Sequence, residues 1–168
     1  MEPIFTDPTP PRYTEAAFPA YRYLPFVPGI AHPRRDPAGH SYGYEEEHLA
    51  GFTADDWRDC HSYLYGIDLF NQGYWWEAHE ALEVVWLAAG QETLTGNFVQ
   101  GLIQIAAAQL KRFIGAPRGA QLLTESGVAK LSLADGIYLG IEINALITAA
   151  QNRLRENRGE YPRISLIF

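Results

Sequence analysis

Hydrophobic and polar residues alternate at helical spacing through most of the chain beyond residue 52. The first such pattern carries apolar side chains at steps of three and four residues, at Trp57, Cys60, Leu64, Ile67 and Phe70, which is typical of an amphipathic helix. The same spacing predicts four further helices over about 74–89, 97–114, 117–131 and 141–157. Strand-like alternation is weak everywhere. Five helices joined by short loops predict an all-α, single-domain bundle of antiparallel hairpins.

Local signals set the expected ends of these helices. Thr53, followed by two aspartates, fits an N-cap with acidic residues in the first turn. Gly73 can end the first helix in a left-handed conformation, and Gly90 is placed to stop the second. Pro117 suits the first turn of the fourth helix. The third helix is apolar nearly all round, which predicts a central, buried position.

The first 37 residues follow a different rule, because they contain nine of the eleven prolines. Proline lacks a backbone N–H and restrains the preceding residue, so no long helix is expected there. Residues 21–30 nevertheless carry several large apolar side chains. We therefore expect an ordered, extended arm that packs across the body, with a mobile tail as the alternative. The predicted division is an arm and loop over 1–52 and a helical bundle over 53–168.

Composition narrows the class of protein. A length of 168 residues suits one domain. The net charge of −7 leaves no basic excess to neutralise phosphates, so nucleic-acid binding is not expected. A single cysteine, Cys60, excludes an internal disulfide and a multi-thiolate zinc site. No apolar run is long enough to span a membrane, and the segment after Met1 lacks the pattern of a secretory signal, so a cytoplasmic location is expected.

The residues with the clearest chemical potential lie in the second predicted helix. At 100° per residue, His79, Glu83 and Trp86 share one sector beside the apolar face, whereas Glu77 and Glu80 are expected to point further out. His79 and Glu83 are four residues apart and so are neighbours. Three interpretations stay open: a buried, hydrogen-bonded structural pair, half of a site for a divalent transition metal, and a general-base pair.

A metal at this pair needs further ligands. The sequence His79-Glu80-x-x-Glu83 resembles the HExxH pattern of zinc proteases, with Glu83 in place of the second histidine. Catalytic zinc usually takes three protein ligands and a water. The candidates for a third ligand are His32, His40, His61 and Asp68.

A second polar feature lies on the third predicted helix. Gln100, Gln104 and Lys111 form one stripe. Glutamines on a mostly buried helix need partners, and His79, Glu83 or backbone groups are the expected ones; a solvated stripe is the alternative. Aromatic residues, among them Trp76 and Trp86, accompany these polar groups, as they do in ligand pockets.

These motifs together resemble the DUF309 family, a bacterial and archaeal group of unknown function. The resemblance rests on Asn71-x-Gly73-x-x-x-Glu77-Ala-His79-Glu80-x-x-Glu83-x-x-Trp86, and on the stretch that begins at Gln100-Gly101 and on Gly119-Ala120. It covers roughly residues 57–158 and implies a helical bundle in which the HxxxExxW motif matters. The Pro-rich arm lies outside this common core and is similar to an N-terminal extension.

Two functional hypotheses follow. The first is a metal-binding domain centred on His79 and Glu83, with or without hydrolytic activity. The second is a non-catalytic interaction or scaffold domain, in which His, Glu and Gln side chains form a buried structural network. The segment Gly73-x-x-x-Glu77-Ala78 resembles one tetratricopeptide hairpin, which keeps a protein partner or a homo-oligomer open. A single hairpin is too few for a repeat protein. Whether the protein is an enzyme, and on what substrate, does not follow from these residues.

Overall fold

The structure, a computed structural model, describes residues 9–156 and 160–168. The N-terminal residues on which the expectation about a secretory signal rests lie outside this part. Five helices make up most of the fold, with one short hairpin: α1 (His61–Asn71), α2 (Trp75–Ala89), α3 (Leu94–Phe113), α4 (Pro117–Leu131), β1 (Ile137–Tyr138), β2 (Ile141–Glu142) and α5 (Ile143–Arg155). The predicted all-α bundle is therefore confirmed.

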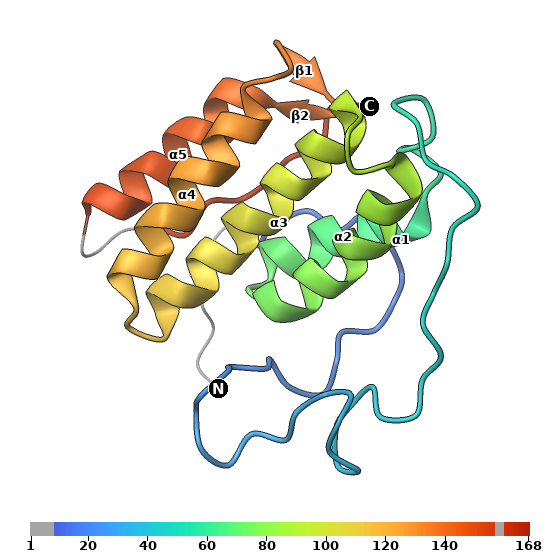
Figure 1. The fold of residues 1–168 in the computed structure, drawn as a ribbon, viewed down its shortest axis with the longest axis vertical. Helices are drawn as coiled ribbons and strands as arrows, with labels where there is room; N and C mark the ends of the chain where they lie inside the picture. Colours follow the sequence, from blue (N-terminus) through green and yellow to red (C-terminus); the bar gives the residue numbers. More distant parts are fainter. Residues whose placement is uncertain (1–8, 157–159) are drawn as a thin grey trace.

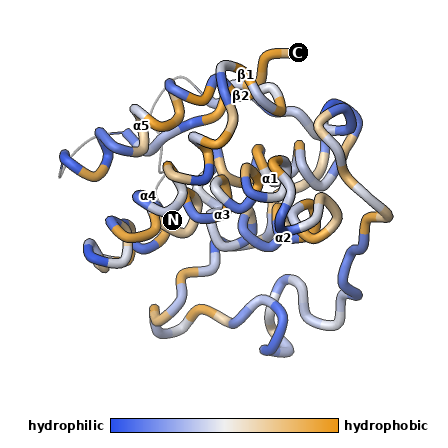
Figure 2. Tube along the Cα trace, turned by 45° about the horizontal axis from the view of Figure 1, so that its top comes forward, coloured by the Kyte–Doolittle hydropathy of each residue, from blue (hydrophilic) through white to orange (hydrophobic). Residues whose placement is uncertain are grey.

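The long helix α3 lies at the centre of the molecule. Figure 1 shows α1 and α2 on one side of it and α4 and α5 on the other, with consecutive helices packed together. Along each helix, hydrophobic and hydrophilic positions succeed one another around the axis (Figure 2), which lets the apolar stripes meet in one core. Phe98, Leu102 and Ile105 of α3 are fully buried in that core, as the apolar third helix predicted. No helix in the described residues is both long and apolar enough to cross a membrane.

The first predicted helix starts later than expected. Thr53 is not the predicted N-cap of this helix; it forms a separate turn with Asp56, in which the Thr53 backbone N–H and hydroxyl both donate to Asp56 Oδ2. The chain then continues through successive turns, and α1 begins only at His61, with Cys60 as its N-cap. Trp57 is buried from the turn rather than from the helix. Isolated turns and helix starts share the same local side-chain hydrogen bonds. The sequence pattern therefore could not distinguish this turn from the start of a helix.

The remaining boundaries lie closer to the predictions. The ranges for α2 and α4 are confirmed within one residue. The third helix starts three residues earlier than expected, because Thr93 caps it by accepting from the Gly96 N–H. The fifth starts at Ile143 and ends at Arg155; its predicted end at residue 157 lies outside the described residues.

The hairpin β1–β2 is a feature that the sequence analysis missed. Its register pairs Ile137 with Glu142 and Tyr138 with Ile141, so the loop has only two residues. Both loop residues, Leu139 and Gly140, have positive φ angles of 49° and 76°, the combination that a type I′ turn requires.

The segment before α1 contacts α1 and α2 at several points. Asp68 of α1 is fully buried and accepts hydrogen bonds from the backbone of Tyr13 and Thr14 and from the Thr14 hydroxyl, at 2.7–2.9 Å. Phe18 stacks on Tyr74, with the ring centroids 5.3 Å apart. These contacts place residues 13–18 against the first helical hairpin.

The predicted burial of residues 21–30 holds for only part of that range. Tyr23 packs edge-on against Trp76, and its backbone N–H donates to Glu77 Oε1 at 2.8 Å. Phe26 and Val27, in contrast, are exposed, Phe26 to 88%. The chain makes a turn there, closed by the bond from the Val27 N–H to the Leu24 carbonyl, and the Phe26 ring meets the ammonium of Lys111, 5.5 Å from the ring centroid.

Candidate functional site

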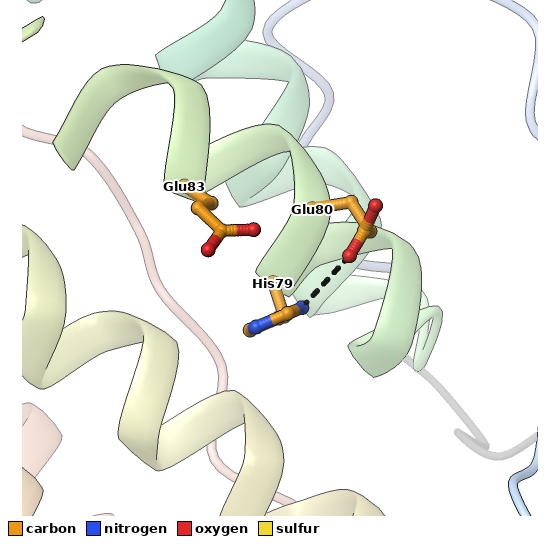
Figure 3. Close-up of side chains that lie close together, drawn as sticks. All are labelled: His79, Glu80 and Glu83. Atoms are coloured by element: carbon orange, nitrogen blue, oxygen red, sulfur yellow. Dashed lines mark ion pairs between the residues drawn. The ribbon is translucent and has the colours of Figure 1, made fainter. Parts of the chain in front are cut away.

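The candidate site is a group of three side chains on the outer part of α2. His79, Glu80 and Glu83 each offer a ligand atom, and these atoms all lie within 4.8 Å of one another. We refer to these three residues as the α2 cluster. Figure 3 shows His79 and Glu83 leaving the helix on the same side, with Glu80 reaching toward the imidazole of His79. No other group of this kind occurs within residues 9–156 and 160–168.

Helix geometry explains why the three side chains meet. His79 and Glu83 are one turn apart, which brings their side chains together. The residues that anchor the helix in the core, among them Ala78 and Leu82, are fully buried, so the neighbouring sector lies at the edge of the core. All three cluster residues are half-buried. The pair is therefore only partly buried, less than a buried structural pair would be, and the cluster faces a partly solvated space.

The contact that orients His79 comes from Glu80, which we had expected to point further out. His79 Nδ1 lies 3.4 Å from Glu80 Oε1. The other oxygen, Oε2, lies 3.2 Å from Nη1 of Arg34. Because Arg34 occupies one oxygen and His79 the other, the Glu80 carboxylate is fixed between the arm and the cluster.

The charges of the α2 cluster change the acid–base properties of its members. The hydrogen bond with Glu80 raises the pKa of His79 against the opposing effect of burial, and the negative charges of Glu80 and Glu83 add to the rise. Burial alone would raise the pKa of Glu80, but the bond and charge of His79, together with Arg34, lower it overall. The pair therefore holds a proton on the imidazole more tightly than a free histidine does.

The histidines expected as a third ligand lie elsewhere. His32 packs its ring against Tyr23 and Trp76. His40 is held by Glu77, and His61 is exposed at the start of α1 with its ring stacked on Tyr65. In the structure, a carboxylate oxygen of Glu80 is the third potential ligand atom of the cluster in their place.

The remaining candidate residues do not join the α2 cluster either. Asp68 is occupied in anchoring the N-terminal arm. Trp76 and Trp86 are half-buried, as are Gln100 and Gln104. Trp86 Nε1 and Gln104 Oε1 are buried atoms that have no hydrogen-bond partner among the described residues, so the structure does not join these groups to His79 in one hydrogen-bonded network. Cys60 is a free, half-buried thiol whose pKa is raised by burial, which disfavours a thiolate nucleophile.

The sequence analysis did not predict the contact of Glu80 with His79 or the burial of Glu77. Helical angles place the Cα–Cβ bond, but a glutamate side chain is long enough to reach an adjacent sector, as Glu80 does. Glu77 is 5% exposed and accepts from Tyr23 and His40. Its partners come from the arm, so the periodicity of α2 alone carried no signal for its burial.

The comparison with known proteins agrees with the resemblance described above. Residues 63–123 match the family model described as Domain of unknown function (DUF309). The matched range starts within α1, includes all of α2 and α3, and ends within α4, so it contains the whole α2 cluster. No curated protein matches the chain.

Proposed function

We propose that this chain, whose residues 63–123 match the DUF309 family model, binds a divalent transition metal at the α2 cluster. The observation that carries the proposal is the convergence of His79, Glu80 and Glu83, with their ligand atoms within 4.8 Å of one another. Imidazole nitrogen and carboxylate oxygen together suit zinc, manganese and nickel. Three protein ligands are also the number that leaves a position for water in catalytic zinc sites.

The surroundings of the cluster support the proposal. Each ligand is half-buried, so an ion can reach it from solvent without crossing the core. Arg34 holds Glu80 Oε2 and leaves Oε1 directed at His79, which is the kind of outer contact that orients a ligating carboxylate. The proposal concerns binding; a hydrolytic reaction at such an ion would be a further step.

Metal binding by single variants tests the proposal. Protein purified without a histidine tag and treated with a chelator is titrated calorimetrically with Zn²⁺, Mn²⁺ and Ni²⁺. We expect one ion per chain, and we expect His79→Ala and Glu83→Gln each to weaken binding by at least about tenfold, since loss of an orienting or ligating group costs about 10–100-fold in affinity. His48→Ala is the control, because His48 is exposed and outside the cluster; it should bind as the unchanged protein does.

Two results would count against the proposal. One is the absence of saturable binding by all three ions. The other is binding that His79→Ala leaves intact. Either result would favour the competing hypothesis of a non-catalytic interaction domain. Weaker binding in His32→Ala, His40→Ala or His61→Ala, with His79→Ala unaffected, would place the ion elsewhere.

A further inference from the structure

A cleft of about 620 Å³ lies between the N-terminal arm and the helices α1 and α2. Its volume falls in the range of small-molecule sites. One wall comes from the arm, including Phe18 and His40, and the other from α1 and α2, including Tyr65, Trp76 and Glu77. The cleft is separate from the proposed metal function, although Glu80 borders both.

The lining of this cleft is strongly acidic. Four glutamates contribute to it, Glu45, Glu47, Glu77 and Glu80, against one arginine, Arg34. The arginine is already compensated, because its Nη1 lies 3.2 Å from Glu80 Oε2 and 3.6 Å from Glu46 Oε1. A concave surface with this excess of one charge raises the local concentration of ligands of opposite charge. The cleft therefore favours a cation.

In one of the four carboxylates, that of Glu77, only one of the two oxygens has hydrogen-bond partners within the described part of the chain. Glu77 Oε1 accepts from the Tyr23 backbone N–H at 2.8 Å and from His40 Nε2 at 3.0 Å. The imidazole is fixed from its other side by Ser41 Oγ, 2.8 Å from Nδ1. Glu77 Oε2 is buried and has no hydrogen-bond partner among the described residues. An unpartnered carboxylate oxygen out of water is costly, so this atom points to a donor that a ligand would bring.

Aromatic rings provide the second requirement for binding an organic cation. Phe18, Tyr44, Tyr65 and Trp76 line the cleft, and the faces of such rings attract ammonium and guanidinium groups. The Phe18 ring is already in contact with the guanidinium of Arg12, 4.1 Å from its centroid, and with the stacked ring of Tyr74, which leaves the other three rings for a ligand. A ligand with an apolar body would pack on the same rings.

We propose that this cleft binds a small organic cation, a primary amine or guanidine with an apolar or aromatic body. The cationic head donates to the Glu77 carboxylate, and the body lies against Tyr44, Tyr65 and Trp76. The proposal rests on the cleft, its charge and the unpartnered oxygen, and it stands whether or not the α2 cluster binds a metal. An anionic ligand held by Arg34 is the opposite outcome, and the test below separates the two.

The test uses probes that differ in charge but share a shape. Phenethylamine, 2-phenylethanol and 3-phenylpropionate are titrated into the full-length protein and followed by calorimetry, with tryptamine and agmatine as further cations. We expect saturable binding of at least one cation, with phenethylamine preferred over the neutral alcohol and the carboxylate. Preference for the carboxylate, or no binding by any of the three cations at millimolar concentration, would overturn the proposal.

Two substitutions with opposite expected effects sharpen the test. Glu77→Gln keeps the shape but removes the charge, and it should weaken cation binding by at least about tenfold, as expected for a charge-assisted hydrogen bond. Arg34→Gln removes the competing positive charge and should strengthen cation binding several-fold. Glu92→Gln is the control, because Glu92 is exposed and does not line the cleft; it should change nothing.

The second substitution keeps the proposal testable if the first one disturbs folding, which a melting curve of Glu77→Gln would reveal. Weaker cation binding in Arg34→Gln would contradict the proposal, as would normal binding in a folded Glu77→Gln. His79→Gln should bind cations as the unchanged protein does, so a failure of the metal proposal and a failure of this one give different results.

Discussion

At the scale of single residues, the polar positions between Asn71 and Trp86 serve distinct purposes. Asn71 is fully buried and pairs with the backbone of Ile164 in both directions, each bond 2.7 Å long, so it fixes the C-terminal segment against α1. Glu77 holds the arm through Tyr23 and His40. His79, Glu80 and Glu83 are half-buried, and their ligand atoms lie close enough together to share one ion. This stretch thus combines anchoring residues with a candidate binding site.

The interaction between His79 and Glu80 makes a prediction about pH. The pKa of His79 is raised above its ordinary value of 6.5, so the protonated imidazole stabilises the fold below about pH 6.5, and this contribution is lost as the pH rises through the raised pKa. A double-mutant cycle with His79→Gln and Glu80→Gln should give a favourable coupling energy of about 0.2–1 kcal/mol at pH 5.5, as for a partly exposed pair, and almost none at pH 8.5.

Urea unfolding with a chelator present measures this coupling without interference from metal. The pKa of Glu80 is lowered, so its carboxylate is charged at both pH values and the change reports on the histidine. A coupling energy that is the same at pH 5.5 and pH 8.5 would show that protonation of His79 does not govern the contact.

Sequence reasoning located His79 and Glu83 together but did not find their partner. Periodicity gives the direction in which a side chain leaves a helix, and this was enough to place the pair on one sector. It does not give the rotamer of a long side chain such as Glu80, nor the contacts that the arm brings, such as Arg34 on Glu80. Burial of Glu77 was unpredictable for the same reason, since its partners Tyr23 and His40 are 54 and 37 residues away in the chain.

At the scale of secondary-structure elements, α3 and α4 cross where each helix has a glycine. A Cβ atom added at Gly101 would lie 3.1 Å from the Gly127 carbonyl oxygen, and one added at Gly127 would lie 3.1 Å from that of Gly101. The two backbones therefore approach each other directly. Gly101 on α3 and Gly127 on α4 together permit this approach, because neither carries a side chain at the contact.

This crossing reverses the usual effect of replacing glycine in a helix. Glycine in a helix interior is less favourable than alanine by about 0.8–1.0 kcal/mol, yet we expect Gly127→Ala to destabilise the protein, by about 1–3 kcal/mol, because the added methyl group overpacks the interface. Gly119→Ala is the matched control on the same helix, since a Cβ there meets only the flexible Lys111 side chain at 3.5 Å or more. It should be neutral or stabilising. Equal effects of the two substitutions in urea unfolding would contradict this description of the crossing.

The elements that sequence analysis predicted least well are the short ones. The ends of α2 and α4 followed from Gly90 and Pro117, whose conformational preferences act locally. The hairpin β1–β2 has two residues in each strand, too few for alternation to be recognised. The turn at Leu139 requires a positive φ at a non-glycine residue, and the sequence Leu-Gly is not a usual signal for it.

At the scale of the whole molecule, α1 binds the extended segments that lie before and after the helices, at residues 13–14 and at residue 164. Asp68 receives the backbone of residues 13 and 14 from one end of the chain, and Asn71, three residues later on the same helix, receives residue 164 from the other. Tyr13 also accepts the Leu166 N–H on its hydroxyl at 2.7 Å, which joins the two segments directly. One helix thus organises both terminal regions.

Substitution of Asp68 tests the role of this anchor. Asp68→Asn keeps the size but removes the charge that three donors share, and we expect it to lower the free energy of unfolding by about 1.5–3 kcal/mol, the usual worth of a hydrogen bond to a charged group. Limited proteolysis should cut the arm faster in this variant. Asp59→Asn, at an exposed position just before α1, is the control. Unchanged stability and unchanged cleavage in Asp68→Asn would show that the arm is held by its other contacts.

The proposed function depends on whether the α2 cluster holds a metal ion. The most direct measurement is an anomalous difference map from crystals of chelator-treated protein soaked with zinc and measured at the zinc absorption edge. We predict a strong peak at a distance of about 2.0–2.2 Å from a nitrogen of His79 and from carboxylate oxygens of Glu80 and Glu83. A map with no peak at the cluster, or with zinc bound only at His32, His40 or His61, would contradict the account.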